Sequence, residues 1–202
     1  MRRHPALLLI VAAVAVLSPA EGVAGPAKGI AVRTYYVVAG NGNCVLSTST
    51  DSADGTSACS LSRDAVTSVT PSEPVDIPVA DGLPLTLDVA QPVRGKVSVR
   101  STTVFSRYGP LGAGTAQLSA RLTGIAGGKE VLVGEATTDP YTVTPASDEY
   151  VVEFVIEPAR RLAGVALDEL TLTLEVSGTA VRHGGIHADG ASRLTLGIAS
   201  AR

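Results

Sequence analysis

The residues with the clearest capacity for chemistry lie near the C-terminus, in the segment His183-Gly-Gly-Ile-His187-Ala-Asp189. Imidazole and carboxylate groups are the side chains that bind zinc or copper. If the segment is extended, the even separations place His183, His187 and Asp189 on one face. The spacing is not that of a zinc protease, because no Glu adjoins the first His and the glycines oppose a helix. The segment predicts either a small metal site or an exposed glycine-rich turn.

Other chemically capable residues point to weaker sites. Asp51 and Asp54-Gly55 could offer oxygens to calcium, but the further acids of a calcium loop are absent, and we expect a solvated turn there. No G-x-S-x-G nucleophile motif occurs. The carboxylates at positions 139, 148, 149 and 153 are typical of an ordinary solvated surface. We therefore expect a non-catalytic protein that uses no cofactor.

A carbohydrate-binding module is an alternative that depends on aromatic side chains. Flat rings stack on sugar faces, and the chain has 5 Tyr but no Trp. Tyr35 and Tyr36 are neighbours in an expected strand, so they point to opposite faces and at most one can lie in the core. The other is a candidate contact for a ligand, as are Tyr108, Tyr141 and Tyr150.

The N-terminus has the features of an export signal. Two arginines, Arg2 and Arg3, precede an apolar run from Ala6 to Leu17, and small residues follow it. The run is too short to cross a bilayer core of about 30 Å, which takes about 20 residues. We expect residues 1–20 to be a signal peptide, with cleavage after Ala20 or Ala24, and the product to be secreted and extracellular without a membrane anchor.

Secretion gives the two cysteines a role. In an oxidising compartment, Cys44 and Cys59 are expected to form a disulfide that closes the polar loop 44–59. Metal ligation by the pair is a weaker reading, because the spacing is not C-x-x-C. The chain-entropy model gives such a loop about 3 kcal/mol of stabilisation.

The charge of the processed chain is mildly acidic. Cleavage after Ala20 leaves 14 basic and 19 acidic residues, a net charge of −5, and cleavage after Ala24 also removes Glu21 and gives −4. This balance argues against a nucleic-acid partner and against electrostatic binding to a membrane surface. The partner that we expect is an extracellular protein or surface.

The elements that must position these residues are short strands. Alternation of apolar and polar residues recurs, whereas long helical periods do not. Residues 71–84 are rich in Pro and predict an edge strand or irregular chain, and Gly164 limits the segment Ala159–Leu170 to a loop or single turn. Strands are expected at Ile30–Ala39, Ala65–Thr70, Leu83–Val89, Val93–Phe105, Ala116–Ile125, Glu130–Thr137, Tyr150–Ile156, Leu170–Val176 and Arg193–Ile198.

The second half of the chain also resembles a known kind of module. Residues 119–199 contain ARLTGIAGGKEVLVGEA, VVEFVIEPARRLAGVALDELTLTLEVSG and HADGASRLTLGIA. Their order of strands and Gly-rich turns is similar to that of jelly-roll accessory domains of secreted bacterial hydrolases and peptidases. The resemblance implies a jelly-roll fold and a binding, packing or stabilising role, and it transfers no functional residue.

These observations predict an all-β protein. We expect residues 28–202 to form a single antiparallel β-sandwich, jelly-roll-like in its second half. Its expected function is a non-catalytic binding or structural role outside the cell. Metal binding by His183, His187 and Asp189 and carbohydrate binding are the alternatives.

Overall fold

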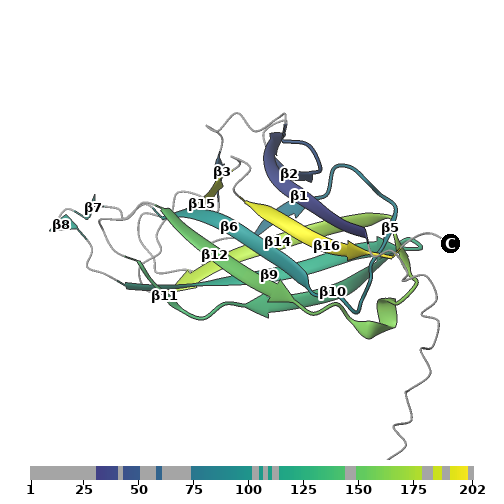
Figure 1. The fold of residues 1–202 in the computed structure, drawn as a ribbon. Helices are drawn as coiled ribbons and strands as arrows, with labels where there is room; N and C mark the ends of the chain where they lie inside the picture. The colour runs from purple at the N-terminus through teal and green to yellow at the C-terminus, as the bar shows by residue number, and fades with distance from the viewer. Residues whose placement is uncertain are drawn as a thin grey trace, which may run out of the picture.

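A computed structural model describes residues 31–40, 43–50, 58–60, 74–101, 105–106, 109–110, 114–143, 149–178, 184–187 and 192–199. Two antiparallel sheets pack against each other, which confirms the predicted all-β sandwich (Figure 1). The expected signal peptide and the predicted strand Ala65–Thr70 lie outside the described residues.

The first sheet has seven strands in the order β2-β1-β16-β6-β15-β3, with β12 on the other side of β6. Figure 1 shows β1, β16, β6 and β12 side by side in one layer. The strands are β1 (Ala31–Gly40), β2 (Asn43–Ser47), β3 (Ala58–Ser60), β6 (Val93–Ser101), β12 (Glu149–Ile156), β15 (Gly184–His187) and β16 (Arg193–Ile198).

The second sheet has the order β10-β9-β14-β4, and β11 also pairs with β9. The strands are β4 (Val75–Pro78), β9 (Gly114–Ala126), β10 (Lys129–Thr137), β11 (Tyr141–Val143) and β14 (Glu169–Gly178). Two small pairs complete the described strands: β5 (Leu85–Thr86) with β13 (Ala166–Leu167), and β7 (Phe105–Ser106) with β8 (Gly109–Pro110).

Turn chemistry explains several boundaries. The hairpin between β9 and β10 turns on Gly127 and Gly128, whose φ values of 54° and 76° lie in the left-handed region. The Pro-rich segment contains β4, an edge strand as predicted. The segment Ala159–Leu170 begins with a single 3-10 turn, η1 (Arg160–Leu162), which agrees with the expected loop.

Two strand predictions were too long. Strand β6 ends at Ser101, and Phe105, the last residue of the predicted strand Val93–Phe105, belongs to β7. The sequence predicts a strand over Leu83–Val89, but the structure forms a strand only at Leu85–Thr86. Asp88 ends it, because its carboxylate accepts the Ala90 N–H at 3.1 Å and its carbonyl accepts the Gln91 N–H at 3.0 Å. Asp commonly forms such a turn with its own backbone. The turn ends the strand pairing, although Leu85 and Leu87 still alternate into the core.

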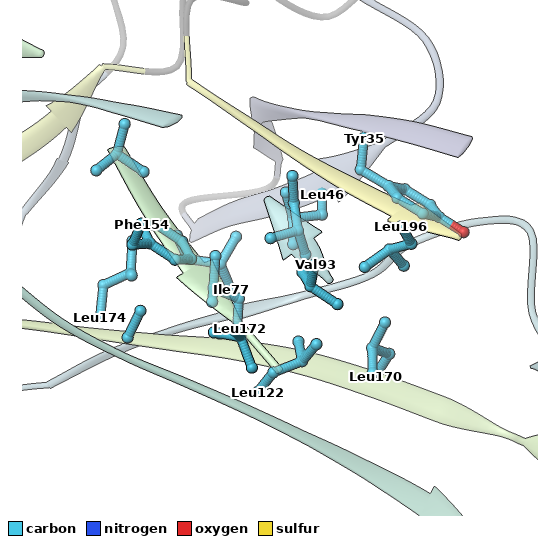
Figure 2. Close-up of a cluster of buried hydrophobic side chains, with 14 of the residues drawn as sticks. Tyr35, Leu46, Ile77, Val93, Leu122, Phe154, Leu170, Leu172, Leu174 and Leu196 are labelled. Atoms are coloured by element: carbon cyan, nitrogen blue, oxygen red, sulfur yellow. The ribbon is translucent and has the colours of Figure 1, made fainter. Parts of the chain in front are cut away.

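The core lies between the sheets and consists mostly of aliphatic side chains. Strand β14 buries Leu170, Leu172, Leu174 and Val176 in strict alternation. Figure 2 shows these leucines facing side chains from the other sheet, including Phe154 and Leu196. At both margins a backbone hydrogen bond links the layers, from Ala80 N–H to the Leu46 carbonyl and from Ala159 N–H to the Val133 carbonyl, each 2.8 Å long.

No helix within the described ranges is long and apolar enough to span a membrane.

Candidate functional site

The outer surface of the seven-stranded sheet carries a cross-strand row of charged and aromatic residues. Glu153 on β12 is paired in register with Lys96 on β6. Lys96 is also opposite Arg193 on β16, and Arg193 is opposite Tyr36 on β1. Because partners in register share a face, the four side chains follow one another across the outside of the sheet.

A second row runs beside the first. Val155 on β12 is opposite Arg94 on β6, which is opposite Thr195 on β16. Thr195 in turn meets Thr34 on β1, with 3.3 Å between the hydroxyl oxygens. Val151 and Val155, on the marginal strand β12, are 57% and 44% exposed, and thus an apolar edge adjoins the cations.

We call this surface the basic face: Arg94, Lys96, Arg193, Tyr36, Glu153, Val151 and Val155. Its positive charge is only weakly compensated. Lys96 Nζ lies 3.8 Å from a Glu153 carboxylate oxygen, and both side chains are well solvated. Arg94 and Arg193 form no ion pair or hydrogen bond with any side chain that the structure describes. Lys96 and Arg193 are directly opposite each other, an arrangement of like charges that destabilises a sheet.

The outer surface of the five-stranded sheet has the opposite character. We call it the acidic face: Asp76, Glu130, Glu135, Glu169, Glu175 and Arg121, with threonines between them. A shallow groove of about 320 Å³ lies on this face, lined by Asp76, Arg121, Thr123, Gly124, Ile125, Glu130, Glu169, Thr171 and Thr173. The Thr173 hydroxyl donates to Asp76 Oδ1 at 2.6 Å, which fixes one side of the groove.

The predicted metal site is only partly covered by the structure. His187 ends β15, which pairs with β6 and β3, while His183 and Asp189 lie outside the described residues. The described residues contain no group of three or more His, Cys, Asp or Glu that could hold a metal ion. The metal site therefore stays a prediction, as does the calcium reading of Asp51 and Asp54, which lie outside the described residues.

The two cysteines belong to strands that approach each other. Cys44 in β2 is 6% exposed, and no free thiol occurs among the described cysteines. Cys59 is in β3, opposite Ile186 of β15, and β3 contacts β2. The topology thus brings the ends of the loop 44–59 to the same region of the seven-stranded sheet.

The tyrosines and carboxylates named from the sequence are spread over the molecule. Tyr35 is fully buried whereas Tyr36 is half-buried on the basic face, so one of the pair is in the core as predicted. Tyr141 and Tyr150 pack together, with ring centroids 5.7 Å apart. Burial of Tyr141, together with the neighbouring Tyr150, raises the pKa of its hydroxyl to about 12. Tyr108 and Asp148 lie outside the described residues.

A hydrogen-bonded carboxylate holds the chain after β2. Asp81 accepts the Ser47 hydroxyl at 2.8 Å and the Thr48 N–H at 3.0 Å. Partial burial acts to raise the pKa of Asp81, but these hydrogen bonds and the charge of Arg33 outweigh it and lower the pKa below its ordinary value. Asp81 is thus a structural clamp for the loop.

Sequence reasoning did not find the basic face. Alternation alone indicates that Arg94 and Lys96 share one side of a strand, but not that Arg193 and Tyr36 join them. No protein-family model matches the chain, and no curated protein matches it.

Proposed function

We propose that this chain is a secreted, non-catalytic β-sandwich domain that binds an acidic macromolecule through its basic face. The N-terminal pattern of Arg2-Arg3, an apolar run and small residues supports secretion. The binding role rests on one observation, the row Lys96–Arg193–Tyr36 and the adjoining Arg94 on the outside of a sheet.

The energetic cost of this row supports a role beyond folding. Like charges in directly opposed positions lower the stability of a sheet, and a single exposed Glu153 offsets little of that cost. An acidic partner would supply the missing counter-charges, and Tyr36 would add a contact with an apolar body and a polar tip. The exposed Val151 and Val155 would lose water on the same contact.

The experiment compares two substitutions that change net charge equally. The intact protein is applied at low ionic strength to immobilised poly-L-glutamate and eluted with salt. Arg193→Gln removes a cation from the basic face, whereas Arg121→Gln removes one from the acidic face. The proposal expects the wild type and Arg121→Gln to be retained and Arg193→Gln to elute earlier. Equal elution of both variants would show that net charge alone governs retention, and it would refute the proposal.

We further propose that Cys44 and Cys59 form one disulfide. The burial of Cys44, the lack of a free thiol among the described cysteines and the contact of β2 with β3 support this pairing. Intact mass measurement of the protein from the culture medium tests it and reads the cleavage site. A mass lower by two hydrogens than the reduced form supports the bond, and full alkylation without reductant contradicts it.

A metal role is the second candidate. His187 lies in the extended strand β15, and the predicted metal site requires an extended chain. In an extended chain, side chains an even number of positions apart, such as those at 183, 187 and 189, point to the same side. Zinc or copper titration by native mass spectrometry tests it against a variant in which His183 and His187 are both Ala. Equal metal content in the two proteins would refute it.

Carbohydrate binding keeps one supporting observation, the groove on the acidic face. Its hydroxyl, carboxylate and guanidinium groups could hydrogen-bond a sugar, although the residues that line the groove include no aromatic side chain. Pull-down on insoluble polysaccharides tests this alternative, and an absence of retention on all of them would refute it.

A further inference from the structure

We propose that the acidic partner of the basic face is a second copy of this chain, which docks with its acidic face. This inference rests on the proposed function, because it names the partner of the same surface. The inference follows from the charged side chains on the outer surface of each sheet. The strand register shows which side chains lie on that surface.

The two faces are complementary in charge. On the basic face the described charged side chains are Arg94, Lys96, Arg193 and Glu153, a net charge of +2. On the acidic face five carboxylates accompany Arg121, a net charge of −4. The folded chain is therefore polarised across its thickness, and each face offers the counter-charges that the other lacks.

Apolar groups accompany the charges on both surfaces. The basic face exposes Val151 and Val155 along β12. On the acidic face, half-buried Ile125 and Leu132 lie between the carboxylates. A contact between copies can therefore desolvate aliphatic groups on both sides while the charges set the orientation.

The geometry fixes the kind of assembly. The faces lie on opposite sides of the sandwich, so a contact that joins one to the other is heterologous and leaves an unused face at each end (Figure 1). Further copies can add to those ends, and the expected product is a linear stack instead of a closed dimer.

The area of the two faces limits the strength of the contact between two copies. Four strands about 4.8 Å apart, paired over about six residues of 3.3 Å, present a flat area of roughly 400 Å². A standard interface buries about 800 Å² on each partner, so a single contact should be weak. Because exposed charges dominate it, raising the salt concentration should dissolve the stack.

Sedimentation velocity over a range of protein concentration measures the association. At low salt the intact wild-type protein should shift to species larger than the dimer, and high salt should return it to monomer. Arg193→Glu should abolish the shift. Arg160→Glu, on η1 and outside both faces, changes the net charge equally and should leave the shift intact.

A mixing experiment tests the heterologous geometry. One variant carries Arg94→Glu and Arg193→Glu, and a second carries Glu169→Lys and Glu175→Lys. Each alone should stay monomeric, because each has lost one of the two faces. An equimolar mixture should form dimers and no larger species, because the surviving acidic face of the first variant meets the surviving basic face of the second.

The outcomes separate this inference from the proposed function. A wild-type protein that stays monomeric at low salt, yet is retained on poly-L-glutamate through Arg193, overturns the second-copy inference and leaves the proposed function standing with another acidic macromolecule as partner. A protein that neither associates nor is retained overturns both. Stacks that are insensitive to Arg193→Glu overturn the inference, as does a mixture that remains monomeric.

Discussion

Replacing Gly95 with Ala should destabilise the fold because of one aromatic ring. Gly95 on β6 is opposite Phe154 on β12, and both face the core. A Cβ atom built on Gly95 would overlap the Phe154 ring. The backbone conformation at Gly95 is not left-handed, and thus space alone requires glycine there. The ring occupies the volume that a side chain at position 95 would take.

The magnitude follows from two opposing effects. At an unobstructed site, Gly→Ala stabilises a protein by about 0.4–1 kcal/mol by reducing the entropy of the unfolded chain. Forcing an extra carbon into a packed core costs about 1–3 kcal/mol. Phe154 is only 4% exposed and has little room to retreat, so the second effect should dominate. We expect a net loss of about 1–2 kcal/mol, which corresponds to a fall in Tm of a few degrees in a domain of this size.

Urea denaturation of four proteins tests this reasoning: the wild type, Gly95→Ala, Phe154→Leu and the double variant. Leu is shorter than Phe and leaves the position above residue 95 open. The loss in the double variant should therefore be smaller than the sum of the single losses, by roughly 0.5–3 kcal/mol. A Gly95→Ala protein as stable as the wild type, or losses that simply add, would refute the account.

Four further predictions concern the core, two titrating groups and the basic face. Leu172→Ala, in the centre of β14, should lower the free energy of unfolding by about 2–5 kcal/mol, and a loss below 1 kcal/mol by urea denaturation would contradict its packing. Because the pKa of Asp81 is lower in the folded chain than its ordinary value of 3.8, Asp81 stabilises the fold fully above pH 3.8. That stabilisation is lost as the pH falls through the lower pKa of the folded state. The gap in urea midpoint between the wild type and Asp81→Asn should therefore close in acid, and a constant gap would be the contrary result. The raised pKa of Tyr141 means that stability present below pH 10.0 is lost as the pH rises towards about 12, so Tyr141→Phe should lose less stability over that range. Arg193→Gln should raise the urea midpoint at low salt, because it relieves a like-charge repulsion of about 0.7 kcal/mol, the Coulomb energy of two unit charges about 6 Å apart in water. Arg121→Gln should lower the midpoint. If both substitutions shift the urea midpoint in the same direction, the assigned registers are contradicted.

Much of the fold could be predicted because alternation acts within one strand. The run LTLTLEV requires no knowledge of partners to place Leu172 inside and Thr173 outside, and the structure agrees. The same logic places Val97 and Val99 in the core and separates Tyr35 from Tyr36. Alternation predicts which side chains face the core but not where the strand ends, as at Asp88, whose carboxylate accepts a backbone N–H of its own turn.

The basic face could not be predicted because it depends on pairing between distant segments. Lys96 meets Arg193 only because β6 is paired with β16, almost a hundred residues later in the chain. Glu153 joins them because β12 takes the other side of β6. Periodicity gives the side of each strand but neither its neighbours nor its register. The sequence could therefore name these residues as exposed but not as a cluster.

The same gap limits what net charge can predict about a binding partner. The net charge, −3 for the full chain and −5 or −4 after the predicted cleavage, argues against an acidic ligand only if that ligand senses the whole molecule at once. At physiological ionic strength the Debye length is about 8 Å, while the sheets of a sandwich are about 10 Å apart before their outward side chains are added. A partner on one face is thus largely screened from the other. The net charge of the whole chain therefore predicts solubility and long-range repulsion, whereas the local charge of one face predicts which ligands that face can bind.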